Sequence, residues 1–253
     1  ELDYEESFTI PATGYTVQGW TLSGWALTST GAVKYGVNYG ELAIATLVDD
    51  ADDVMVNNTI TLYAVWTVNT YAFVLNSNYE SNTQTTGTVA YNATTELADL
   101  TRDGYAFLGW VLANNGTVVF ANTDANVVVV GGQALIEAWN AKENKNPYDY
   151  SSKDSNNAIN LYAIWQAKGF TITYYQNHDA SDSVANAKTD YVFDSTTQTI
   201  NYLYTKNGYY FTGWATQRTG TVVYNNGDVI ADVINTYSEN INLYAIWAEN
   251  TYE

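Results

Sequence analysis

One five-residue pattern, Leu-Tyr-Ala-(Val or Ile)-Trp, occurs three times in the chain, and this repetition constrains the fold more than any other feature. The copies occupy residues 62–66, 161–165 and 243–247. Their large side chains alternate, as in a β-strand whose successive residues point to opposite faces. Because both faces carry bulky groups, we expect each strand to be central in a sheet or covered on both sides. Self-similarity of this kind predicts a chain built from related units.

A second repeated phrase precedes each copy of the first. It reads glycine, aromatic, any residue, apolar, any residue, Gly-Trp, and it occupies residues 19–25, 104–110 and 208–214. This phrase also predicts a strand, and its second glycine marks either a bulge or a close approach by neighbouring backbone or a tryptophan ring. Together the two phrases supply the tryptophans that we predict to form the cores of the units, which are Trp25, Trp66, Trp110, Trp165, Trp214 and Trp247.

The remaining segments point to a mostly β chain with short helical turns. Residues 69–78 and 169–177 are rich in aromatic and β-branched residues and predict strands, with 82–92 as a hairpin partner. Two stretches carry helix signals. A threonine cap predicts a short turn over 94–100, and 131–144 predicts a helix of three turns or less.

The spacing of the phrases predicts three tandem repeats and the start of a further one. We name them repeat 1, repeat 2 and repeat 3, and they cover residues 1–68, 69–167 and 168–248, followed by 249–253. Repeat 1 is expected to lack the opening strands of the others, and repeat 2 carries a polar insertion near 138–157. The short connections between repeats favour a semi-rigid, elongated rod.

Composition argues against several classes of function. The chain has no cysteine and one histidine, His178, which leaves no thiol nucleophile and no partners for a histidine-based metal site. The 27 acidic residues face 9 basic ones, for a net charge of −18, which disfavours nucleic-acid or anionic-membrane partners. No apolar run approaches the roughly 20 residues that a membrane helix needs. We therefore predict a chain that is not an enzyme and needs no cofactor.

Two groups of residues are candidates for binding. The acidic stretch of repeat 1 contains Asp49, Asp50, Asp52 and Asp53. Calcium accepts several oxygen ligands, but the stretch lacks the alternating spacing of a calcium loop, so a solvated loop is the favoured interpretation. Trp139, Tyr148 and Tyr150 do not recur between repeats and lie in or near the insertion. They are candidates for an exposed contact with a glycan or a host protein, with local packing as the favoured alternative.

Both repeated phrases resemble those of the Listeria–Bacteroides repeat, also called the internalin B-repeat type, and the resemblance covers nearly the whole chain. It implies a small β-grasp-like module. It also implies tandem arrays in secreted or wall-attached bacterial surface proteins, where such arrays act as stalks, spacers or adhesive segments.

The resulting prediction is a non-enzymatic, extracellular stalk or adhesive segment at a bacterial cell surface or cell wall. A strand supplied by another copy to repeat 1 would join chains end to end into a fibre. The alternative is a module that binds a glycan or a host protein through the insertion of repeat 2.

Overall fold

The computed structural model describes residues 3–10, 14–80, 82–113, 116–122, 128–143, 158–179 and 187–252. It is mostly β, with 44% strand and 11% helix, which confirms the predicted fold class. The chain divides into two compact units. One comprises Glu1–Ala98 with Trp110–Ala163, and the other Asp99–Gly109 with Ile164–Glu253. This division does not test the three sequence repeats, and the β-grasp and rod assignments stay predictions.

Repeat 1 forms two small sheets and one helix. The elements are β1 (Ser7–Thr9), β2 (Trp20–Ala26), β3 (Tyr35–Gly36), β4 (Glu41–Ala43), α1 (Ile44–Ala51) and β5 (Tyr63–Val68). The sheet has the order β3-β2-β5, and β1 pairs with β4. Helix α1 buries Ile44, Leu47 and Ala51, one face of the helix, against the core of this repeat.

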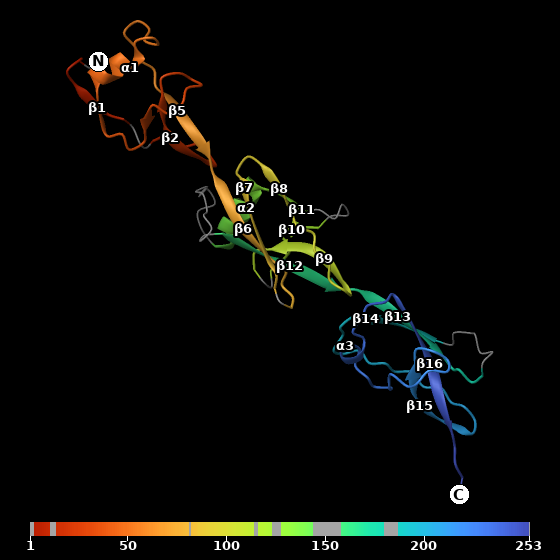
Figure 1. Ribbon diagram of the computed structural model, residues 1–253. Helices are drawn as coiled ribbons and strands as arrows, with labels where there is room; N and C mark the ends of the chain where they lie inside the picture. Colours follow the sequence, from red (N-terminus) through yellow and green to blue (C-terminus); the bar gives the residue numbers. More distant parts are fainter. Residues whose placement is uncertain are drawn as a thin grey trace. The chain divides into compact units, whose positions relative to one another are not determined.

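Repeat 2 forms a larger, mixed sheet. Its elements are β6 (Thr70–Asn76), β7 (Gln84–Ala90), β8 (Thr94–Leu97), β9 (Tyr105–Val111), β10 (Phe120–Ala121), β11 (Val128–Gly131), α2 (Gly132–Lys142) and β12 (Ile159–Ala167). The sheet order is β10-β9-β12-β6-β7. Strand β12 runs parallel to β6, so that Ile159 lies opposite Phe73 and Leu161 opposite Leu75. Helix α2 lies beside β6 (Figure 1).

Repeat 3 repeats this arrangement in shorter form. It contains β13 (Gly169–Tyr175), β14 (Ala187–Val192), β15 (Tyr209–Ala215), α3 (Ile230–Val233) and β16 (Asn240–Glu249). The order is β14-β13-β16-β15, and the two central strands are parallel. Strand β16 carries the third copy of the opening pattern and is central, as predicted.

The second glycine of the Gly-Trp phrase marks a bulge. The strand pairing shifts between Leu22 and Gly24 in repeat 1 and between Phe211 and Gly213 in repeat 3. Gly24 has φ of +154° and Gly213 of +148°, values that side chains rarely adopt. A Cβ at Gly24 would also lie 2.3 Å from the carbonyl oxygen of Tyr35. Glycine is therefore required both for the backbone angle and for the close approach of the neighbouring strand.

One secondary-structure prediction is wrong and another is confirmed. Helix α2 lies within the predicted range 131–144. The turn predicted over 94–100 is instead strand β8, whose Leu97 pairs with Val128 and is buried. The β-branched Thr94 and Thr95 suit a strand, and pairing with β11 overrides the local capping signal.

The six repeated tryptophans separate into two groups. Those of the Gly-Trp phrase are buried, with Trp110 and Trp214 at 0% exposure and Trp25 at 6%. Trp66, Trp165 and Trp247, which end the second pattern, are half-buried. In β16 the side chains of Leu243 and Ala245 are fully buried in the core, and Trp247, two residues further on, is half-buried and packs against the same core. Its indole packs on Phe211 and donates a hydrogen bond to the carbonyl of Gln176 at 2.8 Å.

Candidate functional site

Strand β5 of repeat 1 has an edge that its counterparts do not. In the described part of the chain β5 pairs with β2 only, whereas β12 and β16 lie between two strands. The burial of equivalent residues reflects this difference. Leu161 and Leu243 are fully buried, but Leu62 is half-buried, and Tyr63 is 40% exposed. A strand edge with unpaired backbone groups is a template for an additional strand.

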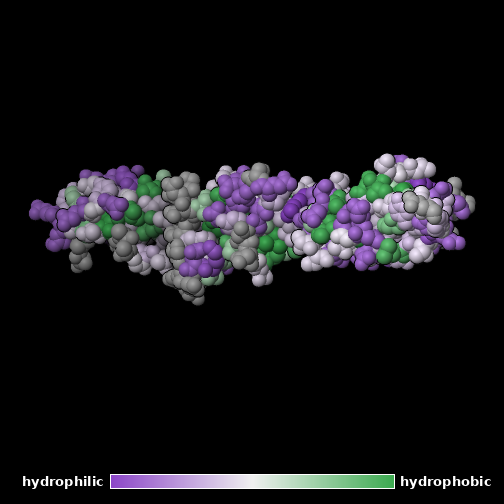
Figure 2. Space-filling view, turned by 90° about the horizontal axis from the view of Figure 1, so that it is seen from below, coloured by the Kyte–Doolittle hydropathy of each residue, from purple (hydrophilic) through white to green (hydrophobic). Residues whose placement is uncertain are grey.

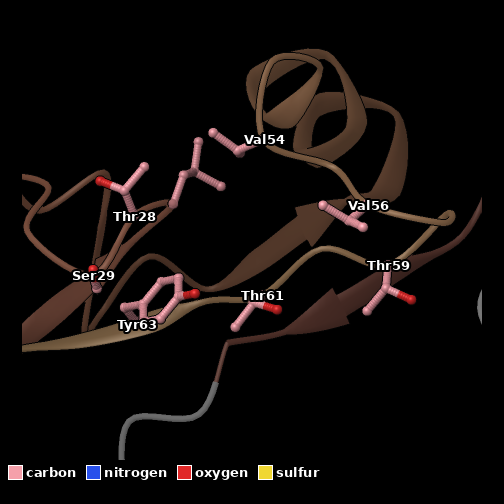
Figure 3. A pocket seen from close by; sticks show the side chains of 8 residues that line it. Thr28, Ser29, Val54, Val56, Thr59, Thr61 and Tyr63 are labelled. Carbon is pink, nitrogen blue, oxygen red and sulfur yellow. The ribbon is translucent and has the colours of Figure 1, made fainter.

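Two hollows lie on the two sides of the segment that leads into β5. One, of about 460 Å³, is lined by Thr59, Thr61 and Tyr63 together with residues after β2 and α1 (Figure 3). The other, of about 490 Å³, is largely apolar and is lined by Asn58 and Ile60 with Tyr4, Ile44, Leu47, Val48 and Met55. The alternation between the hollows follows the two-residue period of an extended chain. The equivalent segment of repeat 2 pairs with β6, so these hollows flank the position that an opening strand occupies elsewhere.

The predicted acidic residues belong to helix α1 and its end. Asp49 and Asp50 lie in the helix, Asp52 caps its C-terminus and Asp53 follows it. Asp50 is 2.8 Å from the Lys34 ammonium group and accepts a 2.7 Å hydrogen bond from the Tyr35 hydroxyl. The residues that the structure describes contain no group of three or more His, Cys, Asp or Glu side chains placed to hold a metal ion. Asp50 thus ties α1 to β3 instead of pointing into a shared cluster.

The contact combines an ion pair at the surface, between Lys34 and Asp50, with a hydrogen bond from the buried Tyr35 hydroxyl. The hydrogen bond from Lys34, followed by that from Tyr35, lowers the pKa of Asp50. Burial, followed by the bond to Asp50, raises the pKa of Tyr35 well above its ordinary value. Tyr35 therefore stays protonated and continues to donate over the physiological pH range.

The insertion candidates are only partly described. Trp139 lies in α2 and is half-buried, while Tyr148 and Tyr150 fall outside the described residues. The contact surface proposed for them stays a prediction. His178 lies against the ring of Trp247 at 5.6 Å between centroids, and its carbonyl accepts a hydrogen bond from Lys206.

A pair of asparagines with equivalent roles escaped the sequence analysis. Asn78 and Asn177 follow the first strand of repeats 2 and 3 and adopt positive φ angles of 59° and 53°. The side-chain amide of Asn78 donates to the carbonyl of Ala163 at 3.0 Å, and that of Asn177 to the carbonyl of Ala245 at 2.9 Å. Each locks the first strand to the last. The signal was present in the sequence as an asparagine soon after each opening strand, but it is weak in a chain so rich in asparagine.

The connection between repeats 1 and 2 is a single residue held by backbone hydrogen bonds. The amide of Asn69 donates to the carbonyl of Gly19 at 2.9 Å, and the Asn69 carbonyl accepts from Tyr91 at 2.8 Å. The Tyr91 ring then covers Gly19 so closely that a Cβ there would lie 2.0 Å from the ring.

The connection between repeats 2 and 3 has the same form. The backbone amide of Lys168 donates to the carbonyl of Gly104 at 2.8 Å, and the Lys168 carbonyl accepts from the amide of Phe193 at 2.9 Å. A Cβ on Gly104 would lie 2.1 Å from the Phe193 ring. The first glycine of each Gly-Trp phrase is therefore a contact between consecutive repeats, a role that the sequence analysis did not assign.

The sheets, linkers and repeated aromatic phrases define a β-rich tandem-repeat protein. The sequence model of the Listeria-Bacteroides repeat domain matches residues 71–135 and 170–246, which lie within repeats 2 and 3. The chain belongs to the Listeria–Bacteroides repeat family. This family is typical of bacterial surface proteins and is a structural repeat, not an enzymatic one.

Two proteins of Evansella cellulosilytica are similar over most of the chain. One is named "Putative membrane protein" and is 26% identical over 198 residues, which are 78% of this chain and 24% of that protein. The other is named "Putative Gly-rich membrane protein" and is 27% identical over 193 residues, 76% of this chain and 18% of that protein. The chain thus corresponds to less than a quarter of either relative's length. None of the described helices is both long and apolar enough to cross a bilayer.

On the face seen in Figure 2, hydrophilic residues predominate and hydrophobic residues form small separate groups. The chain carries a net charge of −18, which favours solubility and disfavours contact with other anionic surfaces.

Proposed function

We propose that this chain is a non-enzymatic spacer within an extracellular bacterial surface protein, and that it holds other parts of that protein at a set distance. The observation that supports this proposal is that each linker between repeats is one residue long and is hydrogen-bonded to both repeats. Only one residue connects β5 to β6 and one connects β12 to β13, and each is bonded to a glycine on one side and an aromatic residue on the other. Such linkers restrict bending between repeats much more than a flexible polar linker would.

The chain is well suited to a direct test of this stiffness because it contains no cysteine. Spin labels on Ser29→Cys and Gln217→Cys would report the distance between the exposed turns after β2 and β15 by electron–electron double resonance. We expect a narrow distance distribution. A control with four Gly-Ser residues inserted between Val68 and Asn69 should broaden it. A distribution in the parent chain as broad as in this control would contradict the spacer proposal.

A second function, binding by strand addition at β5, is supported by the open edge and its two hollows. The occupant would be an extended segment with the alternating apolar pattern of β6, in which Tyr71, Phe73 and Leu75 are buried. Such a segment would hydrogen-bond along residues 60–63 and bury Ile60 and Leu62 more fully. Supplied by another copy, it would join chains into a fibre.

A peptide with the sequence of residues 69–76 tests this binding. Added to the full chain, it should slow hydrogen exchange of the amides at residues 60–64 while leaving those of β12 and β16 unchanged. A control peptide with threonine at the positions of Tyr71, Phe73 and Leu75 keeps the backbone but loses the apolar face, and should give no protection. Equal protection by both peptides, or by neither, would rule out specific strand addition.

A further inference from the structure

The two repeat connections form one construction that is used twice. In each, the first glycine of the Gly-Trp phrase has a positive φ angle, +75° at Gly19 and +72° at Gly104, and is buried. Its carbonyl accepts from the linker residue, and the face of its Cα is covered by an aromatic ring of the following repeat. Only glycine leaves room for a ring at this distance.

Repeat 3 carries a third copy of this construction in which the ring position is open. Gly208 has φ of +81°, and its carbonyl accepts from the amide of Asn250 at 2.9 Å. Unlike Gly19 and Gly104, Gly208 is exposed, and a Cβ placed on it would meet no described atom within 4 Å. Gly208 thus shares with Gly19 and Gly104 the positive φ angle and the hydrogen bond from the linker residue. It differs from them in having no described aromatic ring over its Cα.

The residue beside the glycine supplies a second wall at both places. Tyr105 packs edge-on against Phe193, with 5.9 Å between centroids, and its hydroxyl donates to Asp194. Its counterpart Tyr209 lies next to Gly208 and donates to Glu249 at 3.2 Å. A basic side chain covers each of these tyrosine rings, Arg102 at 3.6 Å and Lys206 at 4.1 Å. Tyr209 and its basic cover therefore take the place beside Gly208 that Tyr105 and Arg102 take beside Gly104. Their hydroxyl partners differ, because Tyr105 bonds to the following repeat and Tyr209 bonds to its own.

The ring that fills the contact comes from a defined turn. Tyr91 and Phe193 are each the first of the two central residues of a four-residue turn, closed by backbone hydrogen bonds from Ala93 to Ala90 and from Ser195 to Val192. In both, the second residue after the ring accepts from the segment that begins the helix. Repeat 1 has the same bonds, from Glu6 to Asp3 and from Ile44 to Glu6, which place Tyr4 at the ring position. Tyr4 is 58% exposed, whereas Phe193, seated on its glycine, is 8% exposed.

We propose that Gly208, Tyr209 and the carbonyl of Asn250 form a docking socket for the turn aromatic residue of a following Listeria–Bacteroides repeat. In both occupied contacts the ring belongs to the repeat whose first strand begins directly after the linker residue, because the linker carbonyl also holds the amide of the ring residue. Asn250-Thr251-Tyr252 repeats the linker and first two residues of β6, Asn69-Thr70-Tyr71. The occupant is therefore a repeat continuing from Asn250. This proposal rests on the proposed spacer function and adds to it the partner of repeat 3, which is a following repeat docked on Gly208.

Nuclear magnetic resonance of an extended chain tests the socket. Residues 1–250 are followed by a second copy of residues 70–167, so that Asn250 takes the place of Asn69. A ring lying over a glycine Cα shifts its Hα resonances upfield. With glycine-selective labelling, the Gly208 Hα resonances should therefore move upfield on extension, into the range of Gly19 and Gly104. If they keep the position they have in the unextended chain while hydrogen exchange shows the added repeat to be folded, the proposal is overturned.

Two variants separate the socket from other causes of a shift. Tyr91→Ala in the appended copy only should return Gly208 to its unextended position, while Gly19, covered by the original Tyr91, stays upfield. If the unextended chain itself shows an upfield shift that grows with concentration and disappears in Tyr4→Ala, a second copy occupies the socket and the assigned occupant is wrong. The spin-label distances lie wholly within the unextended chain, so failure of the spacer proposal and failure of this one are distinguishable.

Discussion

Repeats 1 and 3 carry the same two phrases but bury them differently. Leu243 and Ala245 of β16 are fully buried, whereas the equivalent Leu62 and Ala64 of β5 are half-buried. Strand β16 lies between β13 and β15, while β5 pairs with β2 alone in the described residues. The core of repeat 3 also includes Phe170, Ile172 and Tyr174 from β13, and no described strand plays that part in repeat 1. The difference teaches that a strand's sequence sets the alternation of its side chains, while the neighbouring strands set how deeply those side chains are buried.

The largest expected effect is the loss of the Gly-Trp tryptophan of repeat 3. Trp214 is fully buried, packs on Tyr174 at 4.8 Å between centroids and donates to Asn226 at 2.8 Å. Trp214→Ala should lower the free energy of unfolding of repeat 3 by about 3–5 kcal/mol. Trp25→Ala should cost less, because Trp25 is slightly exposed and belongs to a smaller buried core. Urea unfolding followed by residue-level hydrogen exchange measures both, and an equal or larger loss for Trp25→Ala would break the comparison.

The leucine of the second pattern gives a closely matched pair. Leu243→Ala removes a fully buried side chain and should cost about 2–5 kcal/mol. Leu62→Ala removes a half-buried one and should cost about 1 kcal/mol, in proportion to the smaller apolar area withdrawn from water. The same unfolding experiment reports both. Similar losses would mean that β5 is as well covered as β16, which the open edge does not allow.

Among the described residues, the asparagine lock occurs in repeats 2 and 3, the two repeats with an opening strand. Asn177→Ala removes the hydrogen bonds to the carbonyls of Ala245 and Arg218. It also places alanine at a positive φ angle, where alanine is strained. We expect a loss of about 1–3 kcal/mol, seen as faster amide exchange in β13 and β16. Asn177→Gly keeps the backbone angle without strain and isolates the hydrogen-bond part. If the amides of β13 and β16 exchange as slowly in both variants as in the parent chain, the Asn177 side chain does not hold the two strands together.

The smallest expected effect is a pH dependence special to repeat 1. The pKa of Asp50 is lowered in the folded chain, chiefly by Lys34. The resulting stabilisation is present above the ordinary carboxyl pKa of about 4 and is lost as the pH falls through the lowered value. Acidification should therefore destabilise repeat 1 more than repeat 3, whose described residues contain no counterpart of this contact.

Lys34→Gln is the matched control for that pH dependence. It should raise the pKa of Asp50 towards its ordinary value while the hydrogen bond from Tyr35 remains. Carboxyl resonances of Asp50 followed during an acid titration measure the change. An unchanged midpoint would show that Lys34 does not hold the carboxylate.

The sequence predicted the strands and missed several of their consequences. Both repeated phrases lie in strands, and the second glycine marks a bulge, because alternation and backbone angle are local properties. The turn expected over 94–100 is strand β8, since its partner β11 is more than thirty residues away and no local signal announces it. The half-burial of Trp66, Trp165 and Trp247 was likewise beyond reach, because it depends on which other segments cover each ring.

By itself, the sequence determined the class of this protein: repeated alternating phrases specify a tandem β architecture, and the composition specifies an acidic, cysteine-free surface. Only the tertiary structure decided which copies of a phrase are buried and which glycines touch a ring. Both depend on contacts between segments far apart in the chain. Gly19, Gly104 and Gly208 are indistinguishable as letters and share one backbone angle, but they differ in what lies over the Cα, because that is decided by the adjoining repeat.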